Sequence, residues 1–377
     1  MTKIIAFDKA RRHRRVEDRA RTQSGGASAP ERAHAAASIA GTGRRHGPHL
    51  HGECIAVSIV VPTRGRPQLL NRCLASLALQ RFDPASFEII VVDDGPDDET
   101  REVVAGWTAH CAQHGPEITY IPSMGPHGPA AARNHGWRAA RGEIVAFTDD
   151  DTIARADWLR NGLRAFGEDV DAVWGRIVMP LNGTPTDYEL DAKNLEHAEF
   201  VTANCFCRKH VLEDLGGFDE RFRFAWREDS DFHFRLLEYR AAIVHEPGAV
   251  IMHPIRPAPW GVSLAQVKKV QFDALLYKKH PQLYRRKIRA APRWDFYLMV
   301  ASLFAALGLA AADETGPAAL FGGVWLLGTV RFCLQRLRRT SKSPLHIVEM
   351  IVTSALIPPL AVFWRIVGAL RFRVAFV

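Results

Sequence analysis

The alternation of buried-strand and helix patterns between residues 57 and 148 constrains the fold of this chain more than any other feature. Four short apolar runs match strands that are covered on both faces, at residues 57–61, 88–92, 118–121 and 144–148. Apolar residues at helical spacing separate these runs, for example Leu70, Cys73, Leu74 and Leu77. This βαβα order predicts an α/β fold with a doubly wound, mostly parallel sheet.

Acidic residues directly follow two of the predicted strands. Asp93 and Asp94 follow the second strand, and Asp149, Asp150 and Asp151 follow the fourth. In doubly wound sheets, ligands collect beyond the carboxyl ends of the strands. Adjacent carboxylates repel one another unless a cation binds there, and oxygen ligands favour Mg²⁺ or Mn²⁺ together with substrate phosphates. We therefore expect a metal-assisted phosphate site at this edge, with a solvated acidic turn as the alternative.

Charge and composition divide the 377 residues into three parts. Residues 1–53 carry 11 Lys and Arg against 5 Asp and Glu, a net charge of +6 in a chain whose net charge is +8. This part lacks an apolar period, so we predict a disordered basic arm. Phe7 is its only aromatic residue, which argues against nucleic-acid binding by base stacking. The α/β domain is predicted to cover residues 54–290 and a membrane-associated helical region residues 291–377.

The C-terminal region has the composition of membrane helices. Residues 296–312 carry no formal charge and residues 317–334 carry only Arg331, so each approaches the roughly 20 apolar residues of a spanning helix. Basic residues flank both outer ends, which predicts a hairpin over about 296–334 with both ends in the cytosol. A buried hairpin in a soluble protein is the alternative. A third stretch, 347–370, contains Glu349, Pro358, Pro359 and Arg365, and its sequence allows spanning, re-entrant or interfacial placement.

The cysteines indicate the compartment of the α/β domain. The six cysteines form no CxxC pair and no zinc-ligand spacing, which favours a reduced, cytosolic environment. Cys205 and Cys207 lie on one side of a predicted strand and are expected to be small core residues.

Four sequence motifs occur in an order that resembles family 2 glycosyltransferases of the GT-A fold. They lie at residues 57–65 (VSIVVPTRG), 88–95 (EIIVVDDG), 132–136 (ARNHG) continuing to Asp151, and 216–220 (GGFDE) continuing to 227–231 (REDSD). Each motif is weak alone, but the four in this order cover roughly residues 55–255. The resemblance implies a GT-A fold and a metal-assisted, inverting transfer of a sugar from a UDP- or GDP-linked donor.

The resemblance also implies a set of residues that bind the nucleotide-sugar. Pro62, Thr63 and Arg64 leave the first strand in a tight turn whose donors would face a diphosphate. Asp93 and Asp94 would contact the nucleoside, although one of them could instead cap the following helix. The other expected donor-binding residues are Arg133, Asn134, Asp149 and Asp150, and Arg133 could alternatively anchor its own helix.

The same resemblance implies a metal site. Asp149 and Asp151 match the DxD element of the family, with Asp151 as a ligand of Mg²⁺ or Mn²⁺ and Asp149 facing the ribose or the metal. Such a metal would neutralise the leaving diphosphate. His253 follows another predicted strand and is a candidate further ligand, with a purely structural role as the alternative.

The Glu-Asp pair at 228–229 carries the expected catalytic base. By resemblance, Asp229 removes the proton of the acceptor hydroxyl while Glu228 orients the acceptor. Both carboxylates could instead stabilise the start of a helix. Trp226 is a candidate platform for an acceptor sugar or a core residue, and Asp231 is expected to cap the helix or support the acceptor site.

These expectations define one enzyme and two rivals. The Gln-x-x-Arg-Trp element of processive synthases is absent, because Arg293-Trp294 lacks the Gln, so we expect transfer of one or a few sugars. The predicted membrane region favours a lipid-linked or envelope-glycan acceptor at the cytoplasmic membrane, with the α/β domain in the cytosol. A sugar-phosphate nucleotidyltransferase would have a Gly-rich loop after the first strand, which residues 63–67 do not form. A catalytically inactive, membrane-anchored nucleotide-sugar-binding or scaffold protein is the other alternative.

Overall fold

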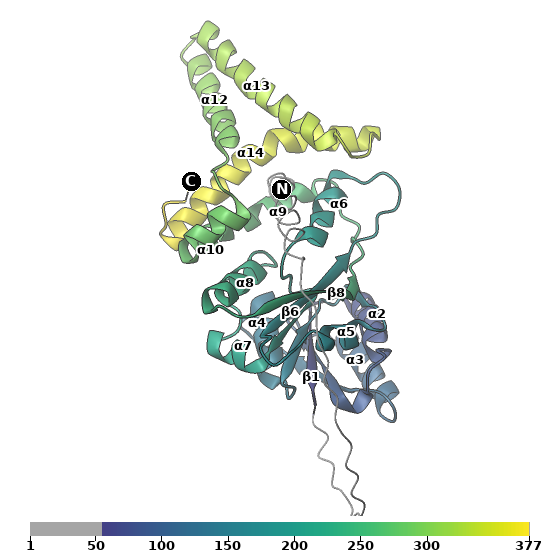
Figure 1. Ribbon diagram of the computed structural model, residues 1–377. Coiled ribbons are helices and arrows are strands. Elements are labelled where there is room, and N and C mark those ends of the chain that lie inside the picture. Colours follow the sequence, from purple (N-terminus) through teal and green to yellow (C-terminus); the bar gives the residue numbers. More distant parts are fainter. Residues whose placement is uncertain (1–54, 377) are drawn as a thin grey trace, which may run out of the picture.

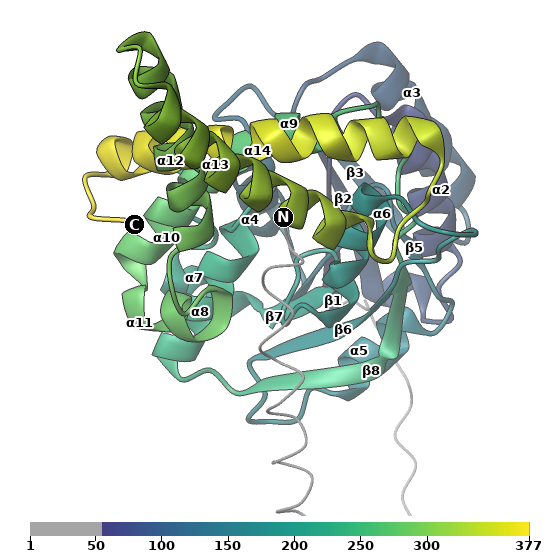
Figure 2. The same ribbon diagram turned by 90° about the horizontal axis from the view of Figure 1, so that it is seen from above.

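The computed structural model describes residues 55–376, so the predicted basic arm at 1–53 lies outside the described residues. One sheet of eight strands, in the order β3-β2-β1-β4-β7-β6-β8-β5, forms the centre of the α/β domain. Helices cover both of its faces, and a helical hairpin projects from one end of the molecule (Figures 1 and 2).

The sheet contains both parallel and antiparallel pairs. Its strands are β1 (Val57–Thr63), β2 (Phe87–Asp93), β3 (Glu117–Pro122), β4 (Ile144–Phe147), β5 (Ile153–Ala154), β6 (Ala172–Val178), β7 (Cys205–Arg208) and β8 (Ile243–Met252). The block β3-β2-β1-β4 is parallel, as predicted, and β6 pairs parallel to β8. Strand β7 runs antiparallel to both β4 and β6, and β5 runs antiparallel to β8. The parallel block therefore brings the carboxyl ends of β1, β2 and β4 to one edge.

Helices connect these strands and continue beyond them. They are α2 (Pro67–Ala78), α3 (Asp98–Cys111), α4 (Pro129–Ala139), α5 (Trp158–Arg164), α6 (Asp187–Ala192), α7 (Lys209–Leu215), α8 (Glu228–Tyr239), α9 (Val262–Val267), α10 (Gln271–Lys279), α11 (Pro281–Leu283), α12 (Trp294–Ala311), α13 (Thr315–Leu337) and α14 (Pro344–Phe372). Short turns of other helix types occupy η3 (Pro84–Ser86), η4 (Lys193–His197), η5 (Lys268–Val270) and η6 (Tyr284–Ile288).

Apolar side chains bury both faces of the sheet. All seven residues of β1 and of β2 are buried, which explains why their sequences are apolar runs without alternation. One core cluster contains residues of α2, α3 and α5, and the other contains residues of α4, α7 and α8. Cys205 and Cys207 are fully buried in the second cluster, as predicted.

Helix α4 packs unusually close to the sheet. A Cβ atom on Gly136 would lie 2.3 Å from Val60 Cγ1, so only glycine fits there. Gly128, just before the helix, has a φ of +124°, and a Cβ atom there would lie 3.0 Å from the Arg223 carbonyl oxygen. These two glycines fix how α4 carries its polar residues to the carboxyl edge of the sheet.

The C-terminal helices form two distinct arrangements. Helices α12 and α13 form an antiparallel hairpin that rises away from the sheet, and α14 runs across the base of this hairpin (Figure 1). All three helices are long and apolar enough to cross a membrane, which indicates membrane association. They differ in burial, because 17% and 11% of the most apolar windows of α12 and α13 are buried, against 39% for α14. The third apolar stretch of the sequence is thus one continuous helix, with Pro358 and Pro359 inside it.

Candidate active site

The predicted acidic residues gather at the carboxyl edge of the parallel strands. The loop after β4 carries Asp149, Asp150 and Asp151, and the end of β8 leads to His253. Helix α8 begins beside them with Glu228. Ion pairs connect these three segments into one cluster.

Asp150 is the buried anchor of the acidic loop. Its side chain is fully buried, Thr63 Oγ1 donates a 2.7 Å hydrogen bond to Oδ2, and Arg66 forms a 2.9 Å ion pair with Oδ1. Burial raises the pKa of Asp150 to about 7, although Arg66 and the Thr63 hydroxyl act in the opposite direction. Asp150 therefore ties the acidic loop to the end of β1, and its two neighbours remain to face a ligand.

Asp149, Asp151 and His253 form a candidate metal site. One ligand atom from each of the three side chains lies within 4.8 Å of the others, and His253 Nε2 is 3.5 Å from Asp151 Oδ1. His253 Nδ1 is buried and has no hydrogen-bond partner among the described residues. Two carboxylates and an imidazole are a suitable donor set for a divalent cation, and the nitrogen ligand suits Mn²⁺ better than Mg²⁺.

Arg133 connects the acidic loop to the start of α8. Its guanidinium is buried, with one nitrogen 2.7 Å from Asp149 Oδ1 and another 3.2 Å from Glu228 Oε1. Burial alone would raise the pKa of Asp149, but the charges of Arg133 and His253 outweigh it and hold this pKa below its ordinary value. Arg133 thus keeps Asp149 ionised and fixes its distance from α8.

Glu228 and Asp229 have different environments although they are adjacent. Glu228 is buried, and burial together with the charge of Asp229 raises its pKa to about 7, against the effect of Arg133. Asp229 is only half-buried, and its Oδ1 accepts a 2.6 Å hydrogen bond from the Ser230 backbone N–H. Asp229 is therefore the carboxylate of the pair with access to a ligand, whereas Glu228 is held in place by Arg133.

The backbone at the start of α8 is strained. Arg227 has a φ of +76°, an unfavourable value for a residue with a Cβ atom. Its buried side chain compensates, because Nε forms a 2.7 Å ion pair with Asp273 and the guanidinium stacks 4.5 Å from the Trp226 ring centre. These contacts hold the backbone turn from which the side chains of Glu228 and Asp229 extend.

Asp93 and Asp94 organise the second strand end in different ways. Asp93 is fully buried and accepts hydrogen bonds from the Tyr120 hydroxyl at 2.9 Å and the Gly95 N–H at 3.1 Å. Asp94 accepts from the Gly128 N–H at 3.0 Å and pairs with Arg64 at 3.4 Å. Asp94 and the mostly exposed Arg64 thus lie next to the start of α4.

Three of the predicted site residues make contacts that join structural elements. The amide of Asn134 bonds to both the N–H and the carbonyl of Phe218, each at 2.8 Å, and so holds the loop before α8. Asp231 is fully buried and pairs with Lys279 at 2.5 Å as well as with Arg235 and His280. Trp226 Nε1 donates to Asp273 at 2.9 Å. The other predicted residues lie at or beside the acidic cluster, with Pro62 buried at the end of β1.

Sequence reasoning missed three basic residues at this site. Arg66 pairs with Asp150 and Asp151, and Arg256 Nε lies 3.1 Å from Asp151 Oδ2. Burial lowers the pKa of Lys269, and the charge of Glu228 opposes this effect. Arg66 belongs to the same short loop as Arg64, and Arg256 follows His253 by three residues. Their closeness in sequence to predicted site residues was the only feature that could have indicated them. Together they provide positive charge that an anionic ligand requires.

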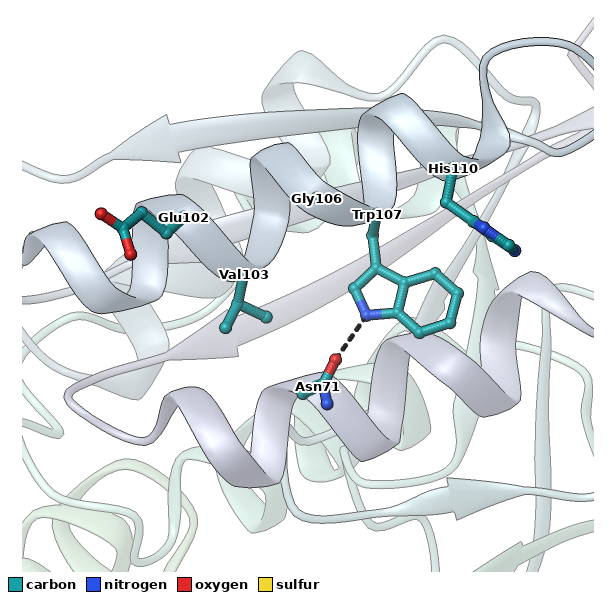
Figure 3. Close-up of a pocket in the computed structure, with 6 residues that line it drawn as sticks. All are labelled: Asn71, Glu102, Val103, Gly106, Trp107 and His110. Atoms are coloured by element: carbon teal, nitrogen blue, oxygen red, sulfur yellow. Dashed lines mark hydrogen bonds between the residues drawn. The ribbon is translucent and has the colours of Figure 1, made fainter.

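A shallow pocket of about 300 Å³ lies elsewhere, between α2 and α3 (Figure 3). In it, Trp107 Nε1 donates a 2.7 Å hydrogen bond to Asn71 Oδ1. Its other lining residues are Glu102, Val103, Gly106 and His110. None of them belongs to the acidic cluster, so this pocket is separate from the candidate active site.

Sequence comparisons identify the family of this α/β domain. Residues 58–216 match the family model described as Glycosyl transferase family 2. The glycosyltransferase AglE of Haloferax volcanii is 27% identical over 213 residues, which cover 53% of this chain and 67% of that protein. The GalNAc(5)-diNAcBac-PP-undecaprenol beta-1,3-glucosyltransferase of Campylobacter jejuni is 30% identical over 151 residues, 40% of this chain and 47% of that protein. The chain thus spans two thirds of the first relative and about half of the second.

A solved structure shows the same fold. The mannosyltransferase PcManGT from Pyrobaculum calidifontis, in complex with GDP-Man and Mn²⁺, matches with a TM-score of 0.55 and 21% identity, covering 82% of this chain and 86% of that chain. The mixed sheet with helices on both faces is therefore that of the GT-A fold. The α/β domain is therefore a glycosyltransferase domain of family 2, over the residues 58–216 that the family model matches. The family match ends at residue 216, so Glu228, Asp229 and His253 lie beyond it.

Proposed function

We propose that the protein transfers a sugar from a UDP- or GDP-linked donor to a lipid-linked or envelope-glycan acceptor, with inversion at the anomeric carbon. One observation supports this proposal above all. Arg133 forms ion pairs with both Asp149 and Glu228, so it holds the metal-competent acids Asp149 and Asp151 beside the start of α8, where the accessible carboxylate of Asp229 directly follows Glu228. A donor diphosphate and an acceptor hydroxyl need these two kinds of group side by side.

The donor would bind along the carboxyl edge of the sheet. Asp93 and Asp94 would contact the nucleoside, with Thr63 and Pro62 shaping the floor and Arg64 beside the diphosphate. Arg66 and Arg256, which pair with the acids in this structure, would exchange these partners for phosphate oxygens. The positive charges then stabilise the diphosphate as the bond to the sugar breaks.

Asp149, Asp151 and His253 would hold a divalent cation, Mn²⁺ or Mg²⁺. When bound, this cation neutralises negative charge on the diphosphate leaving group. Asp150 contributes by holding the acidic loop, and Arg133 contributes by keeping Asp149 ionised.

Asp229 would act as the general base. It accepts the proton of the acceptor hydroxyl as that oxygen attacks the anomeric carbon, and the diphosphate leaves from the opposite side of the sugar ring. One base and one displacement step invert the configuration. Glu228, Trp226 and Asp231 orient the first turn of α8, and Asn134 holds the loop before it, so that Asp229 faces the acceptor.

The acceptor and location are inferred from the C-terminal helices. Three helices able to cross a membrane would keep the site beside a bilayer, where a lipid-linked acceptor resides. The name of the Campylobacter jejuni relative, which acts on an undecaprenol-linked substrate, supports this acceptor class. We place the protein at the cytoplasmic membrane with its α/β domain in the cytosol.

Nucleotide release from UDP- and GDP-sugars tests the proposal. Purified full-length protein is assayed with Mn²⁺ or Mg²⁺ and a membrane-lipid extract as acceptor, beside Asp229→Asn. We expect release from one donor and a loss of about 10²–10⁴-fold in the variant, the usual contribution of a general base. Unchanged donor binding in calorimetry would show that the variant lost only the chemical step.

Matched results separate the rival functions. Asp214→Asn is the control, because Asp214 is an exposed carboxylate that contacts Tyr239 at the far end of α8. Donor binding without turnover in the wild type would favour the inactive binding or scaffold protein. Pyrophosphate release from a nucleoside triphosphate and a sugar phosphate would favour the nucleotidyltransferase.

A further inference from the structure

The outward face of α14 has no polar residue along almost its whole length. Every exposed residue between Leu345 and Leu370 is apolar, including Val348, Leu356 and Phe363. The spacing of three and four residues puts these side chains on one face of the helix. Exposed fractions of 51% for Val348 and 73% for Leu370 show that this stripe extends over more than six turns.

The polar residues of α14 lie on the opposite, inward face. Thr353 and Ser354 are fully buried and accept hydrogen bonds from the Arg336 guanidinium at 2.7 Å and 3.1 Å. Glu349 accepts a 2.7 Å hydrogen bond from the Gly261 N–H, and Arg365 is buried. A surface helix in water has polar residues outward and apolar residues inward. Helix α14 has the opposite arrangement, so its outward face requires an apolar environment.

Both ends of α14 are attached to the α/β domain. At its beginning, Glu349 bonds to Gly261, just before α9. At its end, the Phe372 carbonyl accepts a 2.8 Å hydrogen bond from Lys278 Nζ, and Arg371 donates to Gln271 at 2.9 Å. Phe376 then packs into a core cluster with residues of α8 and α10. A helix held by the domain at both ends does not cross a bilayer.

The hairpin runs in a different direction from α14. Helices α12 and α13 rise away from the rest of the molecule, whereas α14 runs across their base (Figure 1). At 1.5 Å per residue, α12 is about 27 Å long, close to the thickness of a hydrocarbon core. Most exposed side chains of the hairpin are apolar as well, for example Leu307 and Leu327, and its exposed polar residues Asp295, Thr315, Arg331 and Gln335 lie toward the ends of the two helices.

We propose that α14 lies in the plane of the membrane, with its apolar face among the lipid headgroups and upper acyl chains, and that only α12 and α13 cross the bilayer. The occupant of the apolar face is therefore lipid. Helices α12 and α13 both contact α14, so lipid that covers the hairpin would also reach the apolar face of α14. The exposed basic residues Arg338, Arg339 and Lys342, between α13 and α14, lie at the height of anionic headgroups.

The depth of single labels tests this placement. Nitroxide labels are attached to Cys at positions 348, 356, 363 and 370, one at a time, in full-length protein carrying Cys54→Ser and reconstituted in anionic liposomes. The other cysteines, at 73, 111, 205, 207 and 333, are buried. Collision with oxygen and with a water-soluble nickel complex then gives the depth of each label.

We expect all four labels at the same shallow depth, about 5–10 Å below the headgroups. A spanning α14 would separate labels at 348 and 370 by about 33 Å along the membrane normal, because 22 residues rise 1.5 Å each. Phe304→Cys, near the middle of α12, is the deep control, and Leu79→Cys, exposed at the end of α2, is the aqueous control.

Three outcomes would overturn the proposal. Depths that increase steadily from 348 to 370 would make α14 a spanning helix. Free access of the nickel complex to all four labels would put this face in water. Exclusion of both probes, together with spin–spin coupling between labels, would show that a second copy of the chain covers the face instead.

Discussion

Arg133 turns two separate acidic motifs into one site. The acidic loop after β4 and the start of α8 are almost 80 residues apart in the chain, and this buried guanidinium contacts both. Its Nε has no hydrogen-bond partner among the described residues, so its position depends on the two carboxylates. The geometry of the proposed base relative to the proposed metal therefore depends on a single side chain.

Replacing Arg133 by Met should lower stability as well as activity. Glu228 and Asp149 would lose the charge that compensates their burial, and removing one partner of a buried ion pair costs about 3–5 kcal/mol. Thermal unfolding of the detergent-solubilised chain measures the loss. Arg138→Met on the same helix is the control. Arg138 is half-exposed, and its ion pair with Glu220 is long, with 3.7 Å between the nearest nitrogen and oxygen. Equal melting temperatures for the two variants would contradict the linking role of Arg133.

Asp151→Asn should weaken Mn²⁺ binding by at least tenfold, since even the supporting partners of metal ligands contribute 10–100-fold. Electron paramagnetic resonance of free Mn²⁺, titrated with protein in the presence of UDP or GDP, measures this loss without any turnover. Asp157→Asn provides the comparison, because Asp157 is a partly exposed carboxylate paired with Arg81 and Arg160. Identical Mn²⁺ affinities in both variants would argue against the site formed by Asp149, Asp151 and His253.

Sequence could identify the acidic residues of the site but not their partners. Asp149 to Asp151 and Asp229 belong to local motifs that are readable in a few residues. Arg66 and Arg256 reach Asp151 from two loops that only the folded sheet brings together. Asn134 belongs to a motif too, but its amide bonds to a backbone segment 84 residues away, which no local pattern indicates.

At the scale of elements, the strands were predicted best. β1 and β2 differ from their predicted ranges by at most two residues at either end, because a strand buried on both faces needs an uninterrupted apolar run. The antiparallel strand β7 could not be placed in the sheet from sequence, since its register depends on partners on both sides. Helix α14 was ambiguous because Glu349 and Arg365 in an apolar stretch are compatible with several placements. Their inward direction becomes visible only once the helix is packed.

The contact between α8 and α10 should give a pH-dependent stability. His280, at the end of α10, lies 3.2 Å from Asp231 and 2.8 Å from Glu238 of α8. Burial acts to lower the pKa of His280, but its hydrogen bonds to these carboxylates outweigh it and raise the pKa above the ordinary 6.5. Protonated His280 therefore stabilises the fold fully below pH 6.5, and this contribution is lost as the pH rises through the raised pKa.

We expect His280→Ala to lower the melting temperature more at pH 6 than at pH 9. The two measurements use the same detergent and salt, so that only the protonation state differs. The same pair of measurements is made in an Asp231→Asn background. Without Asp231, the effect of His280→Ala on the melting temperature should depend less on pH. A loss of the same size at both pH values would mean that His280 acts through packing alone.

At the scale of the whole molecule, α14 packs against the α/β domain as well as against the hairpin of α12 and α13. Ala369, Phe372 and Phe376 pack against the cluster that contains Phe222 and Tyr284. The predicted boundary at residue 290 marks where the chain changes composition, and it remains a prediction. In three dimensions the chain returns to the domain after the hairpin.

Ending the chain after Ser343 should therefore destabilise the α/β domain. The truncated protein would expose Phe272, Leu275 and Tyr284, which are buried in the full chain. We expect a lower melting temperature and aggregation during size-exclusion chromatography in detergent. Replacing residues 294–337 by a short flexible linker is the matched deletion, and it should be tolerated better because α12 and α13 are mostly unburied. Equal behaviour of the two deletions would contradict this assignment of α14.

The segment from His253 to Gly261 has a kinetic consequence. It joins the candidate metal ligand at the end of β8 to the residue that bonds Glu349 of α14. If α14 lies in the membrane plane, this short segment keeps the carboxyl edge of the sheet, with the candidate active site, close to one leaflet. An acceptor anchored in that leaflet would then reach the site by lateral diffusion in two dimensions. Turnover would follow the surface density of the acceptor, so diluting the bilayer with inert phospholipid would slow the enzyme at constant total acceptor.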